Sequence, residues 1–375
     1  MSIVSLRFSS GSWQLNETHF NNLNLLVGIS GAGKTKTLQA FHTLREAGLK
    51  GARNTPSCRW AMQFRIDEHS YLWKGEILSN SEEEDWSFGE PNENAVFLNE
   101  HIERDGIVLV DRDHASGKFL FNNEALPKLK WTESAITLLA GEDDLTPLKN
   151  ALQCIISSDR APSWHYETQP PTPPHWESLT ELQSATQFPW VIRAKELQDK
   201  YPDHFNEIKS YFIEIFQFVE DVQIVNIKKN FHGNGIIPFD IWTVAIKEKD
   251  VDRWIVGPNL STGMFRTLKL LLELALVPKG TLFLVDEFEN SLGINCLPQV
   301  VEMVNRRQGE IQFILTSHHP YVINNIPWSA WKLVTRRGSV VTIRDVAEIP
   351  SLQTRSSLDR FYLLINAPEY QEGIA

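Results

Sequence analysis

Alternation of apolar and polar residues dominates the first third of the chain. It runs over residues 4–8, and a Gly-Ser pair at 11–12 separates it from a second apolar-polar run, which predicts a hairpin. Residues 59–77 and 106–122 have the composition of further strands joined by turns. Together these segments predict an antiparallel β layer.

Helical spacing replaces this alternation in the middle of the chain. Leucine and isoleucine residues between 138 and 155 predict helices, and residues 204–219 place five apolar side chains on one helical face. No heptad series continues the pattern, so a long coiled-coil arm is not expected. The sequence thus predicts a helical insert that begins at about residue 131.

A strand pattern and a helix pattern flank one glycine-rich stretch. Residues 23–27 form an apolar run typical of a buried strand, and apolar residues over 38–44 recur at helical spacing, with Gly48 as the expected helix end. Between them, GISGAGKT at 28–35 matches G-x-x-x-x-G-K-[ST] in full. The order of strand, loop and helix is the context in which such a loop binds phosphate.

The residues of this loop suit a nucleoside triphosphate. Glycines let successive backbone N–H groups and the helix N-terminus point at β- and γ-phosphate oxygens. Lys34 adds a positive charge, and the Thr35 hydroxyl is a natural ligand for Mg²⁺. A glycine-rich turn with a chance lysine is the alternative. The expected nucleotide-binding residues are Gly28, Ile29, Ser30, Gly31, Ala32, Gly33, Lys34 and Thr35.

Two carboxylates follow another apolar strand. TLFLVDE at 281–287 places Asp286 and Glu287 at the C-terminal edge of the strand, where ligands of open α/β sheets bind. Asp286 is expected to support Mg²⁺, and Glu287 to orient or deprotonate the attacking water. An acidic helix N-terminus is the alternative reading of the pair.

Two further motifs carry polar residues at the end of a strand or the start of a helix. LSTGMFRTL at 260–268 puts Ser261 and Gly263 before a strongly apolar helix, either as a simple N-cap or as an anion site. FILTSHHP at 313–320 gives an apolar strand that ends in polar residues. His318 is expected to sense the γ-phosphate, although a lone strand-end histidine is more often structural.

Composition narrows the range of functions. The chain has 375 residues, 42% of them hydrophobic, and a net charge of −11, which argues against a surface built wholly for nucleic acid. Cys58, Cys154 and Cys296 are odd in number and far apart, so neither a disulfide framework nor a zinc site is indicated. No apolar stretch reaches membrane-spanning length, and the N-terminus lacks a signal-peptide pattern. A soluble, cytoplasmic protein with no membrane partner is expected.

The order GISGAGKT, LSTGMFR, FLVDEFENSLG and TSHHP resembles the ATP-binding-cassette (ABC) superfamily, in its SMC/RecF-like soluble branch. The resemblance covers essentially the whole chain. It implies an α/β fold: an ABC-ATPase head with a mixed central sheet, an antiparallel β layer and a helical lobe. The nucleotide-binding lobe would comprise residues 1–130 and 276–375, and the helical lobe, ending in the signature motif, residues 131–275.

The resemblance also implies an ATPase that works as a pair of subunits. ATP would lie with Mg²⁺ between two heads, so that Lys34 and Thr35 of one subunit face Ser261 and Gly263 of the other across the γ-phosphate. A homodimer or higher oligomer is therefore expected. The glutamine that links Mg²⁺ to the first lobe in this family has no clear counterpart, and Gln63 is a weak candidate that reads more simply as a core-strand residue.

A compact head of this kind is similar to small ATPases of bacterial anti-phage systems such as Septu, PARIS and the OLD family. The hypothesis is a sensor or regulatory subunit that controls a separate nuclease or toxin. PDHFNEIK at 202–209 contains PD and E-x-K, the residue types of a nuclease motif. These two parts are too close together in the sequence for an in-chain nuclease. The alternative is a RecF-like DNA-binding repair ATPase, whose groove would use Lys228 and Lys229, or Arg336, Arg337 and Arg344.

Overall fold

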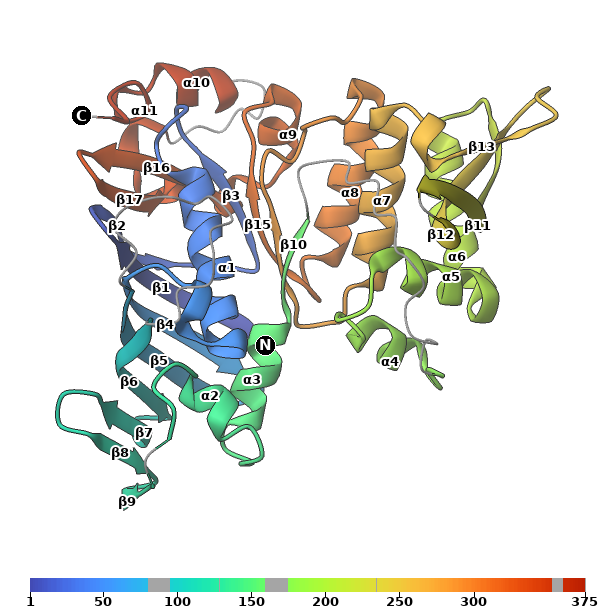
Figure 1. Ribbon diagram of the computed structural model, residues 1–375. Helices are drawn as coiled ribbons and strands as arrows, with labels where there is room; N and C mark the ends of the chain where they lie inside the picture. The colour runs from blue at the N-terminus through green and yellow to red at the C-terminus, as the bar shows by residue number, and fades with distance from the viewer. Residues whose placement is uncertain (80–94, 128, 159–174, 234, 353–359, 375) are drawn as a thin grey trace. The chain divides into compact units, whose positions relative to one another are not determined.

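The computed structural model shows two compact units (Figure 1). The structure describes residues 1–79, 95–127, 129–158, 175–233, 235–352 and 360–374. Unit 1 is assembled from three parts of the chain, Met1–Ser157, Gly280–Phe288 and Arg307–Ala375, and unit 2 from the remaining two, Ser158–Lys279 and Glu289–Arg306.

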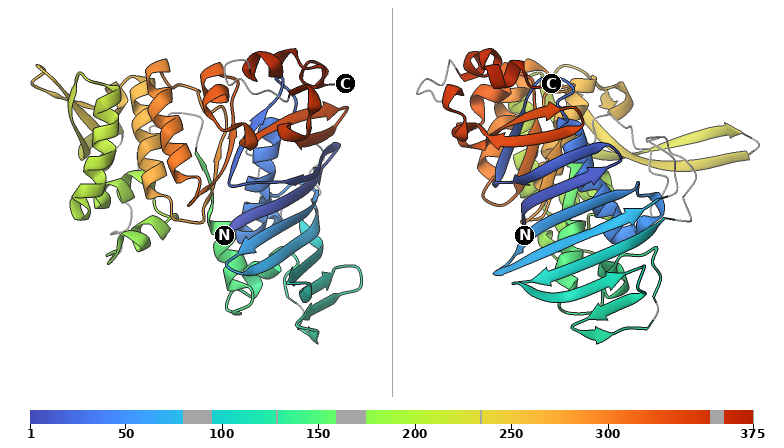
Figure 2. Two further views of the ribbon diagram at one scale, coloured as in Figure 1. Left: turned by 180° about the vertical axis from the view of Figure 1, so that it is seen from behind. Right: turned by 90° about the vertical axis from the view of Figure 1, so that its left-hand side faces the viewer.

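One large mixed sheet forms the centre of unit 1. Among the described residues it has 14 strands, in the order β10-β14-β15-β3-β16-β17-β2-β1-β4-β5-β6-β7-β8-β9. Parallel pairs join β14 to β15, β15 to β3 and β3 to β16, whereas β1 and β4 to β9 run antiparallel to their neighbours. The blue to green antiparallel strands face the viewer in the right-hand view of Figure 2. The predicted mixed sheet with an antiparallel layer is confirmed.

The strands of this sheet are β1 (Ser2–Ser10), β2 (Trp13–His19), β3 (Leu23–Val27), β4 (Cys58–Ile66), β5 (His69–Leu78), β6 (Val96–Arg104), β7 (Ile107–Asp113), β8 (Lys118–Phe121), β9 (Glu124–Ala125), β10 (Ile155–Ser158), β14 (Leu282–Val285), β15 (Gln312–Thr316), β16 (Trp331–Arg337) and β17 (Val340–Asp345). The predicted hairpin at 11–12 is present, and a second hairpin joins β16 to β17; Gly11 and Gly338 supply the positive φ of the two turns.

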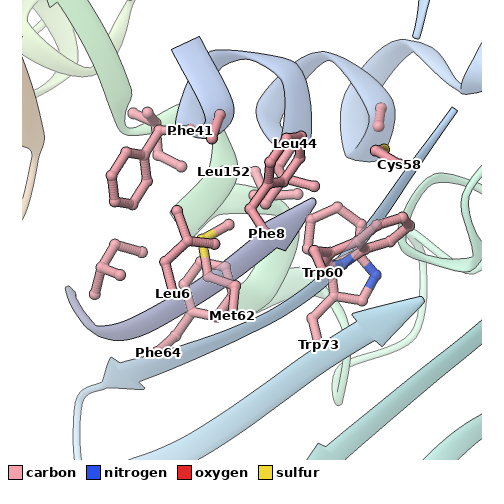
Figure 3. Packing of buried hydrophobic residues seen from close by; sticks show 14 of the residues in the cluster. Leu6, Phe8, Phe41, Leu44, Cys58, Trp60, Met62, Phe64, Trp73 and Leu152 are labelled. Atoms are coloured by element: carbon pink, nitrogen blue, oxygen red, sulfur yellow. The ribbon is translucent and has the colours of Figure 1, made fainter. Parts of the chain in front are cut away.

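Helix α1 (Lys34–Lys50) covers one face of the antiparallel layer (Figure 3). Phe41 and Leu44 on the helix pack in one core with the sheet residues Leu6, Phe8, Met62 and Phe64. The other helices of unit 1 are α2 (Ala135–Leu138), α3 (Thr146–Gln153), α9 (Pro320–Asn325), α10 (Arg360–Asn366) and α11 (Pro368–Gln371), with 3-10 turns η1 (Ala52–Asn54), η4 (Trp328–Ala330), η5 (Val346–Glu348) and η6 (Pro350–Leu352).

The prediction that Gly48 ends α1 is wrong. The helix continues to Lys50, and Gly51, with a φ of 88°, follows as its cap. A Cβ atom on Gly48 would lie 2.4 Å from Cδ1 of Leu152 in α3. Glycine at this position therefore permits close packing of two helices, and the sequence pattern alone does not separate this use of glycine from capping.

Unit 2 combines helices with a three-stranded antiparallel sheet in the order β11-β12-β13. The predicted helix over 204–219 is shorter than expected: it ends at Ile215, and Val219 begins a strand in which Val222 and Ile224 alternate with a polar residue. The elements are β11 (Val219–Gly233), β12 (Gly235–Glu248), β13 (Trp254–Val256), α4 (Leu179–Ser184), α5 (Trp190–Lys200), α6 (Pro202–Ile215), α7 (Thr262–Leu276) and α8 (Leu297–Arg307), with η2 (Gly257–Asn259) and η3 (Ile294–Cys296).

A buried arginine connects three helices of unit 2. The guanidinium of Arg193 in α5 donates hydrogen bonds to the carbonyl oxygens of Leu276 at 2.9 Å, Phe188 at 3.2 Å and Gln183 at 3.3 Å. Burial lowers the pKa of Arg193 to about 10, so the group stays protonated at neutral pH. The charge thus satisfies the carbonyl group of Leu276 at the end of α7, which the helix itself leaves without a partner.

A buried ion pair ties the antiparallel layer of unit 1 to the start of α2. Glu100 and Arg112 have fully buried side chains, and Arg112 Nη1 lies 3.2 Å from Glu100 Oε2. The Ser134 hydroxyl and the Trp73 indole N–H both donate to Glu100 Oε1, at 2.5 and 2.9 Å. The guanidinium also lies over three aromatic rings, those of Phe97, Phe119 and Trp131. Removal of one charge would leave the other buried without its partner.

Arg112→Met is expected to lower the free energy of unfolding by about 3 kcal/mol, because the Glu100 carboxylate would remain buried without a counter-charge. Urea denaturation followed by circular dichroism measures the change. Arg59→Met is the matched control, since Arg59 pairs with Glu76 at 2.8 Å but its side chain is 72% exposed. That change is expected to cost much less, because water screens an exposed ion pair. Equal losses in the two variants would contradict a special role for the buried pair.

Candidate nucleotide-binding site

The glycine-rich loop lies between β3 and α1, as the sequence predicts. Gly28, Gly31 and Gly33 have φ angles of 156°, 83° and 106°, which L side chains rarely adopt. A Cβ atom on Gly28 would lie 2.5 Å from the backbone oxygen of Val334 in β16, and one on Gly33 would lie 2.7 Å from Cγ2 of Val341 in β17. Glycine is therefore needed at both ends of the loop, for conformation and for space.

Lys34 begins α1 and folds back over the loop. Its ammonium group donates to the carbonyl oxygens of Gly28 at 2.7 Å and Ile29 at 3.0 Å, and the side chain is largely buried. Thr35 and Ile29 are half-buried, Ala32 is buried, and Ser30 and Gly31 are exposed. A cation and the amides of a first helical turn thus lie next to one exposed loop, which is the arrangement that binds phosphate.

Asp286 and Glu287 follow β14 directly, at its carboxyl end. The last parallel pair of β14 and β15 is Val285 with Leu315. Beyond it the Thr316 hydroxyl donates to Asp286 Oδ1 at 2.5 Å and accepts from the Glu287 N–H at 2.7 Å. Thr316 is a residue that the sequence reasoning missed. The position of Thr316 at the end of an apolar strand is visible in the sequence, but its contact with Asp286 is not.

The ends of three strands place the predicted groups of unit 1 at one edge of the sheet. β15 lies between β14 and β3, and all three run parallel. Their carboxyl ends therefore share one edge, with the two carboxylates after β14, His318 after β15 and the loop after β3. Thr316 pairs with Leu26, so the chain leading to His318 starts beside the loop. His318 itself is exposed.

Ser261 and Gly263 lie in unit 2, at the start of α7. The Ser261 hydroxyl accepts a hydrogen bond from the Met264 N–H at 3.3 Å, so the residue caps the helix. Capping leaves Ser261 exposed, and Gly263 is half-buried. A Cβ atom on Gly263 would lie 3.3 Å from the carbonyl oxygen of Ser291. A role for these two residues in nucleotide binding stays a prediction.

The groups at the sheet edge fit a nucleotide bound with Mg²⁺. This ion takes oxygen ligands, keeps several waters and is commonly held by one or two protein groups together with substrate phosphates. Thr35 and Asp286 offer a hydroxyl and a carboxylate of this kind. Among the described residues, no three His, Cys, Asp or Glu side chains are grouped as a preformed metal site. A Mg²⁺ ion held through phosphates does not require such a group.

Gln63 lies on β4 and faces away from the helix that carries Lys34. Its neighbours Met62 and Phe64 point into the core under α1, and successive side chains of a strand point to opposite faces. The Gln63 amide donates to the hydroxyl of Ser70 on the next strand at 3.1 Å. This placement does not favour Gln63 as the glutamine that links Mg²⁺ to the first lobe.

The three arginines considered for a DNA groove do not lie on one face of their hairpin. Arg337 and Arg344 lie on one face of the β16–β17 hairpin, whereas Arg336 lies on the other, as the antiparallel register requires. Arg337 and Arg344 are exposed, and Arg336 is half-buried. The side chains of Lys228 and Lys229 lie outside the described residues.

The last described residues of the chain pack against the glycine-rich loop. The Arg336 N–H donates to the Gly373 carbonyl at 2.7 Å, and Ile374 forms a parallel bridge with Arg336. A Cβ atom on Gly31 would lie 3.4 Å from Ile374 Cδ1, and one on Gly373 would lie 3.4 Å from Ile29 Cγ1. No sequence motif signals this contact, because it joins opposite ends of the chain.

The family described as "AAA domain, putative AbiEii toxin, Type IV TA system" matches residues 141–324. This segment includes Asp286, Glu287 and His318 but begins after the glycine-rich loop. No curated protein matches the chain in sequence. Residues 141–324 are therefore similar to an AAA domain of AbiEii type, and this similarity points to an ATPase.

Among solved structures, three SMC head domains are similar to the chain. The head bound to the C-winged helix domain of ScpA has 15% identity and a TM-score of 0.48, over 92% of this chain and 98% of that one. The head from Thermotoga maritima has 12% identity and a TM-score of 0.42, over 92% and 99%. The head with an extended coiled coil bound to the C-terminal domain of ScpA, derived from Pyrococcus furiosus, has 16% identity and a TM-score of 0.42, over 91% and 95%.

Among the described residues, no helix combines the length and the apolar character that crossing a bilayer requires.

Gly28→Ala is expected to weaken ATP binding by about tenfold or more, because the new Cβ would meet the Val334 carbonyl and shift the loop. Equilibrium titration with a fluorescent ATP analogue measures the affinity. Gly106→Ala is the matched control: Gly106 has a φ of 78°, but a Cβ there would have nothing within 4 Å. The control should lose some stability and keep its affinity. Unchanged affinity in Gly28→Ala would show that the close approach to β16 does not shape the loop.

Proposed function

We propose that the protein is an ATPase that binds and hydrolyses ATP, with Mg²⁺, at an interface between two copies of the chain. The observation that supports it most is the shared sheet edge, where the loop, the Asp286–Glu287 pair and His318 follow three adjacent parallel strands. The match to an AAA domain adds independent support, because it spans the carboxylates and His318 but not the loop.

Each group at this edge has a distinct role in the proposed reaction. Lys34 and the first-turn amides of α1 bind the β- and γ-phosphates. Thr35 and Asp286 hold Mg²⁺, which neutralises charge on the transferring phosphoryl group in sites of this kind. Glu287 orients the attacking water and accepts its proton, and His318 contacts the γ-phosphate.

Ser261 and Gly263 complete the proposed site from the second copy. They stand at the N-terminus of α7, a helix of 15 residues with an exposed capping serine. Backbone N–H groups at such a terminus attract anions. In the proposed dimer, this terminus of one copy faces the γ-phosphate held by Lys34 and Thr35 of the other, so that an isolated subunit hydrolyses ATP slowly.

The proposed biological role is a cytoplasmic sensor or regulatory subunit of a bacterial anti-phage system that controls a separate nuclease or toxin. The description of the matching family names a toxin of a toxin–antitoxin system, which is a setting of paired proteins. Co-purification from cells that carry the neighbouring genes is expected to recover a stoichiometric nuclease or toxin. Purification without any partner, together with salt-sensitive, ATP-dependent DNA binding, would favour the RecF-like alternative.

Lys34→Ala is expected to abolish ATP binding and turnover, because the charge on the phosphates is lost. Glu287→Gln should still bind ATP but lose at least about 100-fold in kcat, since water activation is lost while the loop is intact. ATP-bound dimers of Glu287→Gln should therefore accumulate. Isothermal titration, phosphate release and sedimentation velocity measure the three properties.

Two variants serve as controls for this pair. Lys36→Ala removes an exposed lysine two residues after Lys34, and Glu289→Gln neutralises a half-buried carboxylate two residues after Glu287. Both are expected to bind and hydrolyse ATP like the unmodified protein. Equal affinity and turnover in Lys34→Ala, Glu287→Gln and the unmodified protein would remove the assignment of the site.

A further inference from the structure

Thr316 holds three consecutive residues of the segment that carries the carboxylates. Its hydroxyl donates to Asp286 Oδ1 at 2.5 Å and accepts from the Glu287 N–H at 2.7 Å. Its carbonyl oxygen accepts from the Phe288 N–H at 2.9 Å. Thr316 is 1% exposed and ends β15, so its own position is fixed by the sheet. One buried residue thus contacts the segment through both side chain and backbone.

These contacts occur where the strand ladder ends and the chain becomes strained. The parallel pairing of β14 and β15 stops at Val285 and Leu315. Two residues later Glu287 has a φ of 48°, in the left-handed region that residues other than glycine rarely adopt. Such a conformation persists only where the surrounding structure holds it. The hydrogen bonds from the Glu287 and Phe288 N–H groups to Thr316 are contacts of this kind.

The hydrogen-bond directions define what Thr316 does to each carboxylate. The hydroxyl has one proton, which it donates to Asp286 Oδ1, and its lone pair accepts the Glu287 N–H. This arrangement requires an unprotonated Oδ1 and orients the Asp286 carboxylate. It also fixes the backbone conformation of Glu287 and therefore the direction of its side chain. A single hydroxyl therefore couples the position of the proposed metal ligand to that of the proposed base.

We propose that Thr316 is a positioning residue for ATP hydrolysis. It does not contact the reacting atoms itself. It sets the orientation of Asp286 toward Mg²⁺ and the direction of Glu287 toward the attacking water. The proposal rests on the ATPase function proposed above and gives a role to Thr316, the first residue of TSHHP, to which the sequence motifs assign none.

Thr316→Val, which keeps the shape of the side chain and removes the hydroxyl, is expected to lower kcat by about 10- to 100-fold, because small displacements of catalytic groups have effects of this size. The KM for ATP should change less than about threefold, since the loop is intact. The Mg²⁺ concentration for half-maximal activity should rise, because Asp286 loses its orientation. Thr316→Ser restores the hydroxyl and should recover activity to within about threefold of the unmodified protein.

Thr18→Val is the matched control. Thr18 is 2% exposed, and its hydroxyl donates to the Asn16 carbonyl at 3.0 Å in β2, four strands away from β15 in the sheet. It should keep both kcat and the Mg²⁺ dependence. A Thr316→Val protein with unchanged kcat and Mg²⁺ dependence would overturn the proposal. So would a Thr316→Ser protein as slow as Thr316→Val, or an equal loss in Thr18→Val.

A second readout does not depend on turnover. In a crystal structure of Thr316→Val, Glu287 is expected to leave the left-handed region and Asp286 to change its side-chain rotamer. Retention of both conformations would overturn the proposal. If the unmodified protein does not hydrolyse ATP, the proposed function fails, whereas the crystal structure still decides whether Thr316 positions the two carboxylates.

Discussion

The register of three parallel strands is the constraint on which the candidate site depends. Val285 opposes Leu315, and Thr316 opposes Leu26, so each of β14, β15 and β3 ends within one residue of the strand beside it. A slip of one residue would turn each strand's side chains to the opposite face and move the groups at its end. The relative positions of Lys34, Asp286 and His318 are therefore consequences of strand pairing more than of local loop structure.

Buried polar side chains contribute to this register where apolar packing alone would tolerate a shift. Asn24, fully buried in β3, donates to the Phe313 carbonyl of β15 at 2.9 Å and also bonds the backbone of Asn21. Gln312, at the start of β15, accepts from the Ile3 N–H and donates to the Ile3 carbonyl. A slipped strand would leave these buried amides without partners, at a cost of about 1–3 kcal/mol each. Hydrophobic burial stabilises the sheet, whereas the buried amides determine how its strands are aligned.

Strands that are marked by a local run of apolar residues were predicted correctly from the sequence. The apolar runs at 23–27, 281–287 and 313–320 are bounded by polar residues or glycine and correspond to β3, β14 and β15. The prediction at Gly48 was wrong because the sequence does not distinguish a glycine that permits close helix packing from a glycine that ends a helix. Contacts between distant residues, such as Thr316 with Asp286 or Ile374 with Gly31, have no local signature. The functional roles of Ser261 and Gly263 remain predictions for the related reason that the proposed contact involves a second copy of the chain.

The conformation of the glycine-rich loop depends on the residues that pack against it as well as on its own residues. Val334, Val341 and Ile374 approach Gly28, Gly33 and Gly31 respectively, so β16, β17 and the end of the described chain all contact it. A loop held in this way would lose little conformational entropy on binding the phosphate proposed for it, which would favour affinity without any further contact to the ligand. The same packing makes the loop sensitive to changes far along the sequence. Displacement of Ile374 would remove a contact from the loop while every residue of GISGAGKT stayed unchanged.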